Sequence, residues 1–286
     1  MEIFKEIGPM RAFIRSARIQ QRSIGFVPTM GALHEGHRAL VRASKQQNDL
    51  TVCSIFVNPT QFNNANDLAK YPRTVSEDIV QLQSEKCDVL FLPEVATMYE
   101  TPHQLTFSLG ELDQLWEGKF RPGHFSGVAL VVSKLFNIVQ PSRAYFGQKD
   151  FQQFLVIQRL VNELLFDLEL ICFPTVREPD GLALSSRNKR LSAQGRVDAL
   201  ALYKSLVAAR QSLQRGEPWA SVKKAIETNL ENSGNVRLEY FALASRENLF
   251  PIEHVSSENL SKAVLLIAAY VEDVRLIDNL FVEADS

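Results

Sequence analysis

The chain has 286 residues, of which 45% are hydrophobic and 22% are charged, and its formal net charge is −2. These values are ordinary for a globular protein. The length allows one large domain or two smaller ones, with a core that needs no disulfide or metal. The charge balance gives no sign of a nucleic-acid partner, which usually requires a basic stripe. No apolar run approaches the ~20 residues that span a bilayer, and residues 1–14 lack the pattern of a signal or transit peptide. We therefore expect a cytoplasmic protein that binds neither nucleic acid nor a membrane.

The three cysteines, Cys53, Cys87 and Cys172, lie far apart and form no CxxC pair. An odd count without metal-ligand spacing argues against a disulfide framework or a zinc ribbon. Each cysteine lies in an apolar, strand-like stretch, and free cysteine is often buried. The pattern predicts reduced thiols that pack as small hydrophobic side chains.

Short β-rich runs alternate with helical patterns over residues 1–177, which predicts βαβ units around a parallel sheet. The expected strands are residues 23–28, 50–57, 88–92, 143–146 and 168–173, with a further short strand at 105–109. The expected helices are residues 37–47, 74–85, 125–139 and 151–166. The helix at 125–139 carries an apolar stripe at helical spacing, and Pro141 ends it.

The pattern changes near residue 177. Residues 176–191 are polar and rich in turn signals, among them Pro179-Asp180-Gly181. Two helices are expected at 193–215 and 218–231, followed by strands at 237–244, 263–270 and 275–282. The sequence therefore predicts an α/β domain over residues 1–177 and a smaller α+β domain over residues 178–286.

The loop VPTMGALHEGH, residues 27–37, joins the first clear strand to the first clear helix. At such a turn the free backbone N–H groups and the helix dipole favour an anion. Gly31 and Gly36 would let a phosphate approach the backbone. His34 and His37 are three residues apart and can converge on one phosphate. This is the pattern of the HxGH adenylate-transfer signature, in which two imidazoles stabilise the charge that grows as pyrophosphate leaves.

Other readings of this loop lack a required residue. A zinc protease helix needs HExxH, and HEGH is one residue short. A P-loop needs Lys followed by Ser or Thr after its second glycine, where this chain has His37-Arg38. No GxGxxG is present, so a dinucleotide fold has little support.

Polar residues also follow the later expected strands, where ligands bind in open α/β sheets. Asn58 and Gln61 could hydrogen-bond a small polar substrate, although either amide alone also suits a turn. Lys149 could place a charge on a phosphate, and Asp150 could cap a helix or bind a ribose hydroxyl or a metal. Residues 184–187 suit a phosphate clamp or a plain polar linker. Together these loops suit one nucleotide and one small acid.

Six blocks of the sequence resemble the pantoate–β-alanine ligase (pantothenate synthetase) family of the HxGH nucleotidyltransferase superfamily. They are VPTMGALHEGH, SIFVNPTQF, YPRT at 71–74, RPGHFSGV, YFGQKDFQQ and PTVREPDGLALSSRN. The likeness runs from about residue 24 to 191 and continues more weakly to residues 275–279. It implies a Rossmann-like N-terminal domain that binds ATP and pantoate, a smaller C-terminal lid domain, and a cytoplasmic homodimer.

The resemblance also implies the reaction and its residues. ATP, with Mg²⁺, would adenylate (R)-pantoate, and the amine of β-alanine would then displace AMP. The implied catalytic residues are His34, His37 and Lys149. Pantoate would bind at Gln61 and Gln153, and β-alanine also at Gln61. The implied ATP contacts are Met30, Gly31, Ala32, Leu33, His34, Glu35, Gly36, His37, Gly147, Gln148, Lys149, Asp150, Val176, Leu184, Ser185, Ser186 and Arg187. The metal ligands are not assigned.

One departure from the family pattern is visible. The family block is usually Gly-Glu-Lys-Asp, and this chain has Gln148 where the glutamate stands. The change removes one negative charge, so a carboxylate role at this position is in doubt, while Lys149 and Asp150 are retained. Two alternatives stay open: another HxGH-type adenylyltransferase that acts on a different small acid, and a nucleotide-binding module without catalysis. Of these, the module gives Gln61 and Gln153 no role.

Overall fold

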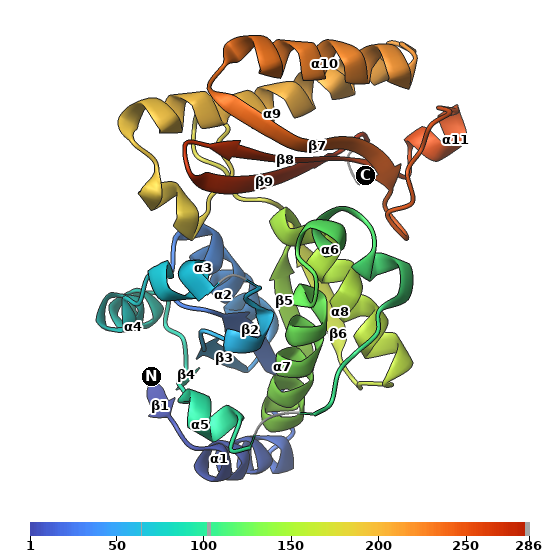
Figure 1. Ribbon diagram of the computed structural model, residues 1–286. Coiled ribbons are helices and arrows are strands. Elements are labelled where there is room, and N and C mark those ends of the chain that lie inside the picture. The colour runs from blue at the N-terminus through green and yellow to red at the C-terminus, as the bar shows by residue number, and fades with distance from the viewer. Residues whose placement is uncertain (64, 102–103, 284–286) are drawn as a thin grey trace. The chain divides into compact units, whose positions relative to one another are not determined.

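The computed structural model describes residues 1–63, 65–101 and 104–283 (Figure 1). Its contacts divide the chain into two compact units. Unit 1 comprises residues 1–148 and 152–174, and unit 2 comprises residues 149–151 and 175–286, described as far as residue 283. The short segment 149–151 therefore packs with the C-terminal part of the chain, although the residues on either side of it belong to unit 1.

Unit 1 is built on a six-stranded parallel sheet of order β1-β4-β3-β2-β5-β6. Its strands are β1 (Glu2–Phe4), β2 (Ile24–Thr29), β3 (Leu50–Ile55), β4 (Val89–Phe91), β5 (Arg143–Gly147) and β6 (Glu169–Phe173). Its helices are α1 (Ile7–Ile19), α2 (Glu35–Gln47), α3 (Ala65–Lys70), α4 (Val75–Ser84), α5 (Val95–Met98), α6 (Trp116–Phe120), α7 (His124–Val139) and, apart from its first residue, α8 (Phe151–Glu163), with the 3₁₀ turns η1 (Pro59–Gln61) and η2 (Gly110–Asp113). The 3₁₀ turn η3 (Gln148–Asp150) begins in unit 1, and its last two residues belong to unit 2.

Helices cover both faces of this sheet, which explains why its central strands β2 and β3 are mostly apolar and almost wholly buried. Every residue of β3 is buried. In β2, Phe26 packs edge-on against Phe136 of α7, while the next residue, Val27, belongs to the cluster that contains Leu40 and Val41 of α2. Because successive strand residues point to opposite faces, α7 and α2 lie on opposite sides of the sheet.

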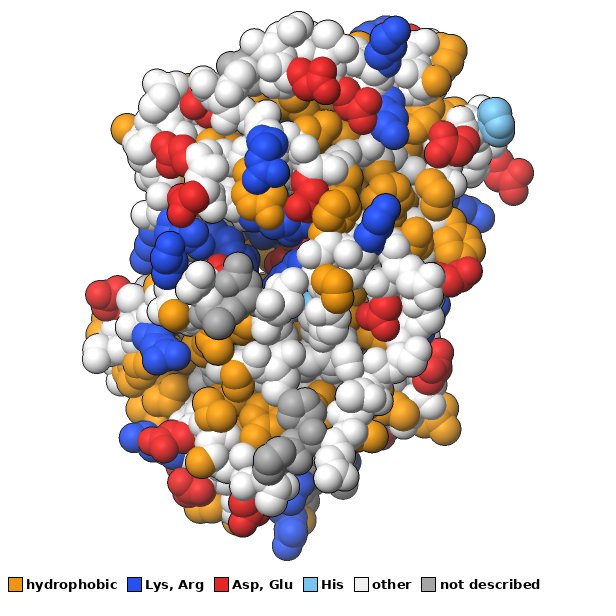
Figure 2. Space-filling view, viewed as in Figure 1, with side chains coloured by type: hydrophobic (Ala, Val, Ile, Leu, Met, Phe, Trp, Pro, Cys, Tyr) orange, Lys and Arg blue, Asp and Glu red, His pale blue; other side chains and the backbone are white. Residues whose placement is uncertain are grey.

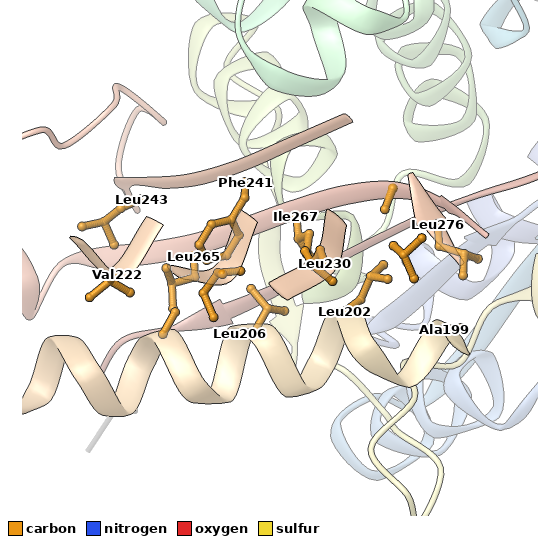
Figure 3. Packing of buried hydrophobic residues seen from close by; sticks show 14 of the residues in the cluster. Ala199, Leu202, Leu206, Val222, Leu230, Phe241, Leu243, Leu265, Ile267 and Leu276 are labelled. Atoms are coloured by element: carbon orange, nitrogen blue, oxygen red, sulfur yellow. The ribbon is translucent and has the colours of Figure 1, made fainter. Parts of the chain in front are cut away.

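Unit 2 is a three-stranded antiparallel sheet of order β7-β8-β9 with two long helices along one face (Figure 1). Its elements are η4 (Ser186–Arg190), α9 (Ala193–Gln214), α10 (Trp219–Ser233), β7 (Val236–Ser245), α11 (Ser257–Leu260), β8 (Ala263–Val271) and β9 (Val274–Phe281). Alternate residues of β8, such as Leu265 and Ile267, face Leu202 and Leu206 of α9, as Figure 3 shows. This period of two in the strand confirms the predicted α+β character of the smaller part.

The predicted α/β class is confirmed, and one predicted element is wrong. Residues 105–109 form no strand. Their backbone donors are taken by side chains instead: Phe107 N–H donates to Ser126 Oγ at 2.9 Å, and Leu109 N–H to Asp113 Oδ2 at 2.9 Å. Strand β1, helix α1 and the short helices α3, α5, α6 and α11 were not predicted. In the part of the chain that the structure describes, helices are all too short or too polar to cross a bilayer.

Candidate active site

The polar loops of unit 1 meet at the point where the sheet order reverses. From β2 the chain proceeds to β3 and β4 on one side, and later to β5 and β6 on the other. The loop after β2, residues 30–34, is thus flanked by the residues that follow β3 and those that follow β5. Ligands of open α/β sheets bind at this switch point, outside the carboxyl ends of the strands.

His34 and His37 cap helix α2 reciprocally. His34 is the N-cap residue, and its Nδ1 accepts from Gly36 N–H at 3.2 Å. Nδ1 of His37 accepts from His34 N–H at 3.4 Å, and the two ring centroids lie 4.1 Å apart. Because each Nδ1 accepts from the backbone, the proton of each neutral imidazole resides on Nε2. The capping box therefore turns both histidines into N–H donors of fixed orientation.

The backbone N–H groups of the preceding residues are not directed to a ligand, contrary to our expectation. Ala32 and Leu33 donate to the two oxygens of Asp78, at 3.0 and 2.8 Å. Asp78 is fully buried on α4. Gly31 has a φ of +78°, and its N–H donates to Thr29 Oγ1 at 3.2 Å. The loop is thus shaped by a buried carboxylate, which takes the backbone donors of Ala32 and Leu33.

Sequence reasoning missed Asp78, although a signal was present. Asp78 lies three residues after Val75 and four before Leu82, so it interrupts the apolar stripe of the predicted helix. A carboxylate in a buried stripe needs donors, and the positive-φ turn at Gly31 supplies them.

Gln61 ends the 3₁₀ turn after β3 and is buried, with 8% of its surface exposed. Its Nε2 donates to Met30 Sδ at 3.0 Å, which joins two of the expected substrate-site residues directly. Asn58 caps the same turn, is 1% exposed, and donates from Nδ2 to Gln61 Oε1 at 3.1 Å. Gln153, on α8, is partly buried, and among the described residues its amide has no hydrogen-bond partner.

The block after β5 is divided between the two units. Gly147 ends β5, and Gln148 is the last residue of that part of unit 1. Lys149 belongs to unit 2, where its carbonyl accepts from Asn279 Nδ2 at 2.9 Å. Lys149 Nζ lies 3.8 Å from Asp150 Oδ1, and its side chain is 17% exposed. Asp150 ends η3 and is half exposed.

The remaining expected ATP contacts lie in unit 2 on a hairpin and the turn after it. Leu184 N–H donates to the Val176 carbonyl at 3.1 Å, and Gly181, with a φ of +99°, occupies the turn. Ser185 caps η4 by accepting from Arg187 N–H at 3.2 Å. Lys and Arg side chains gather over this segment in Figure 2, where the last turn of η4 carries Arg187, Lys189 and Arg190. The segment with Ser186 is therefore an ordered, capped turn with a cationic end.

No cluster of three or more His, Cys, Asp or Glu side chains that could hold a metal occurs among the residues the structure describes. The cysteines do not contribute chemistry either. Cys53 and Cys87 are buried, and burial raises the pKa of both thiols, that of Cys87 to about 12. They therefore remain protonated and unreactive at neutral pH. Cys172 on β6 is partly buried and is not part of a disulfide bond.

Comparison with known proteins places this geometry in a family. The family model described as Pantoate-beta-alanine ligase matches residues 2–281. A pantothenate synthetase of Pseudothermotoga lettingae is 47% identical over 280 residues, covering 98% of each chain, and one of Cytophaga hutchinsonii is 45% identical over 277 residues, covering 96% of this chain and 97% of the relative.

Two solved structures extend the similarity to the fold. The pantothenate synthetase of Thermus thermophilus gives a TM-score of 0.92 at 42% identity, covering 99% of this chain and 100% of that one. The pantoate-beta-alanine ligase of Francisella tularensis, complexed with beta-gamma ATP and beta-alanine, gives a TM-score of 0.81 at 37% identity, covering 100% of this chain and 99% of that one.

Proposed function

Because the chain belongs to the pantoate-beta-alanine ligase family, we propose that it joins (R)-pantoate to β-alanine at the expense of ATP. A carboxylate oxygen of pantoate attacks the α-phosphorus of ATP, and pyrophosphate leaves. The amine of β-alanine then attacks the acyl carbon of pantoyl adenylate, loses a proton, and displaces AMP to give pantothenate. The adenylate makes the acyl carbon reactive toward a neutral amine, which a free carboxylate is not.

The paired ring donors at the start of α2 carry this proposal. Nδ1 of His34 and of His37 accepts from a backbone N–H, so each neutral ring carries its proton on Nε2, an N–H of the kind that donates to phosphate oxygens. As the bond to pyrophosphate breaks, negative charge accumulates on those oxygens, and donors already held in place stabilise it without reorganisation. Adenylation needs this charge stabilisation and correct positioning, and it does not need a nucleophilic side chain.

The other assigned residues complete the two ligand sites. We assign ATP contacts to Met30–His37, Gly147–Asp150, Val176 and Leu184–Arg187, with Lys149 as a charge on phosphate. Gln61 and Gln153 bind pantoate, and Gln61 also contacts β-alanine. The buried Gln61 amide supports this assignment, as does the Gln153 amide, which has no hydrogen-bond partner in the described part of the chain, because pantoate offers carboxylate and hydroxyl oxygens. Unit 2, with the capped turn at η4, serves as the lid that keeps water from the labile adenylate.

Mg²⁺ enters as part of the substrate Mg·ATP. Magnesium in such enzymes is held by one or two carboxylates together with the substrate phosphates. The described residues fit that arrangement better than a preformed cage, since they hold no metal cluster and the half-exposed Asp150 carboxylate stands beside Lys149.

We also propose a cytoplasmic homodimer that interacts with neither nucleic acid nor membrane. The use of ATP and the free cysteines suit a reducing compartment. The dimer is proposed from the family resemblance.

The decisive assay measures pantothenate and AMP formed from ATP, pantoate and β-alanine. The proposal expects AMP and pantothenate in equal amounts and no ADP. ATP–pyrophosphate exchange with a panel of acids tests the alternative adenylyltransferase: exchange that requires another acid and ignores pantoate would overturn the proposed substrate. ATP binding without AMP release would favour a non-catalytic module.

Replacement of His34 or His37 by alanine should lower the rate of pyrophosphate exchange by roughly 10²-fold or more, the scale for loss of a preorganised donor. His254→Ala is the matched control, because His254 is exposed on a loop of unit 2. Exchange at the wild-type rate in both site variants would refute the assigned roles.

A further inference from the structure

Tyr99, which lies outside every motif assigned above, is connected to Gln61 through a single side chain. Its hydroxyl donates to Asn58 Oδ1 at 2.8 Å. Asn58 Nδ2 donates to Gln61 Oε1 at 3.1 Å, and Gln61 Nε2 donates to Met30 Sδ at 3.0 Å. The chain Tyr99–Asn58–Gln61–Met30 lies wholly in unit 1.

The direction of this chain is set by backbone groups whose polarity cannot change. Asn58 Oδ1 accepts from the Thr60 N–H at 3.4 Å, and Nδ2 donates to the carbonyl of Gly127 at 3.2 Å. An N–H can only donate and a carbonyl can only accept, so the orientation of the Asn58 amide is determined. Gln61 must then turn Oε1 toward Asn58, which leaves its NH₂ group on the side of Met30.

Tyr99 is itself held in place by helix α7. Lys134 Nζ lies 4.3 Å from the centroid of the Tyr99 ring and donates to the Met98 carbonyl at 2.5 Å. Burial raises the pKa of the Tyr99 hydroxyl, so the phenol stays protonated and remains a donor. The Tyr99 hydroxyl also lies 3.3 Å from Thr60 Oγ1, and the Thr60 hydroxyl donates to the same Asn58 Oδ1.

The main chain of Gln61 is fixed from the same helix. His124 is buried, and its Nδ1 lies 2.8 Å from the Gln61 carbonyl oxygen, which can only accept. Nε2 of His124 therefore accepts from Arg121 Nη1 at 3.1 Å. With both main chain and amide fixed, the remaining freedom of Gln61 is small.

The partner of the Gln61 NH₂ group identifies what it would bind. A thioether sulfur is a weak acceptor. A ligand oxygen that replaces Met30 Sδ would therefore form a stronger hydrogen bond with the NH₂ group of Gln61. The oxygens of a carboxylate or hydroxyl accept from an NH₂ group. If the Gln61 amide were flipped, its carbonyl oxygen would instead face these acceptor oxygens, and no hydrogen bond to a carboxylate would form. The polarity of Gln61 thus selects an acceptor-rich acid.

On the basis of the proposed function, we propose that Tyr99 is a positioning residue for the pantoate site: its hydroxyl orients Asn58, and Asn58 orients the Gln61 amide with the NH₂ group toward the substrate acid.

Tyr99→Phe tests this inference, because it removes one hydroxyl and keeps the ring over Lys134. We expect KM for pantoate in pyrophosphate exchange to rise between about threefold and tenfold, the range for one net hydrogen bond. KM for ATP should stay within about twofold of wild type. A partly unfolded preparation lowers kcat and leaves both KM values unchanged, so the two KM values report on positioning alone.

Tyr145→Phe is the matched control. Tyr145 is fully buried on β5, and its hydroxyl bonds Gln47 Oε1 at 2.9 Å and Asn48 Nδ2 at 2.7 Å. It should lower Tm and leave KM for pantoate unchanged. An equal rise of both KM values in Tyr99→Phe, or no rise in KM for pantoate, would overturn the inference.

Asn58→Asp provides a second test. It replaces the Nδ2 donor of Asn58 with an acceptor oxygen and keeps the size of the side chain. The new carboxylate would face Gln61 Oε1 and the Gly127 carbonyl with no donor. We expect kcat/KM for pantoate to fall by about a hundredfold, because two bonds are lost at once. A fall below threefold would contradict the relay. Wild-type enzyme without pantoate-dependent exchange would instead refute the proposed function itself.

Discussion

A buried ion pair joins the hairpin of residues 176–184 to β9. Arg177 donates from Nη1 to Asp278 Oδ2 at 2.6 Å and from Nη2 to Oδ1 at 2.9 Å, and the side chains are 15% and 4% exposed. Burial raises the pKa of Asp278, and the Arg177 guanidinium opposes that rise. The carboxylate therefore depends on its partner to remain charged in the interior.

Arg177→Met should reduce the free energy of unfolding by about 3–5 kcal/mol, the cost of leaving a buried charge unpaired. In the variant the pKa of Asp278 rises further above its unfolded value. The penalty is then largest near pH 7 and shrinks as the pH falls and the carboxyl takes up a proton. Urea unfolding at pH 7 and pH 5 measures both effects.

Arg215→Met is the control for this prediction, because Arg215 and Glu217 form an exposed pair. Such pairs contribute little. The free energy of unfolding could fall as little in Arg177→Met as in Arg215→Met, or the fall could be the same at pH 5 as at pH 7. Either result would mean that Asp278 is neutral in the wild type.

At the scale of elements, the approach of helix α7 to turn η1 depends on a glycine. A Cβ on Gly127 would lie 2.2 Å from the Thr60 carbonyl oxygen and 2.8 Å from Gln61 N. These are backbone atoms that cannot move aside without displacing the turn. The same close approach lets the Gly127 carbonyl reach Asn58. The helix and the turn can form the amide relay only because residue 127 has no side chain.

Gly127→Ala should therefore destabilise the protein by about 1–3 kcal/mol through overpacking and raise KM for pantoate, since the turn carries Gln61. Gly8→Ala is the same change in helix α1, where a Cβ meets nothing within 4 Å. It should stabilise by up to about 1 kcal/mol. Thermal unfolding of the two variants measures the difference in stability between them. If Gly127→Ala leaves the stability unchanged, the turn η1 moves to make room for the new side chain.

Most elements could be predicted because their own residues specify them. The buried strands β2 and β3 are mostly apolar, and α7 carries an apolar stripe. Helix α1 was missed because Gly8 and Pro9 suggest a turn. Both lie in the first helical turn, where proline costs no hydrogen bond. The false strand at 105–109 arose because side-chain acceptors, which no local pattern reveals, satisfy its backbone.

The local geometry at the start of α2 could also be predicted, whereas the assignment of its residues to a ligand stays a prediction. His34 and His37 lie in one contiguous motif whose spacing suits a helix start. Asp78 and Tyr99 act through contacts with residues 45 and 41 positions away in the chain. Their roles follow from tertiary geometry, so the sequence can indicate at most that a buried polar group such as Asp78 needs a partner.

At the scale of the whole molecule, the proposed dimer predicts a solution mass of about twice the 32.3 kDa of the chain. Light scattering during size-exclusion chromatography over a range of protein concentrations measures it. A mass of one chain at micromolar concentration would contradict the dimer and leave the catalytic proposal standing, since each step was assigned to residues of one chain.

The histidine cap of α2 has a consequence for how this protein can be changed. Helices start best with Ser, Thr, Asp or Asn at the position that His34 occupies. A screen for thermal stability alone would therefore favour His34→Asp, because aspartate is a better N-cap residue. Aspartate has no imidazole N–H to donate, and its negative charge would repel a phosphate. If His34 has the proposed role in adenylation, stability and turnover make opposite demands on this residue, and engineering a more stable enzyme requires selection for both properties.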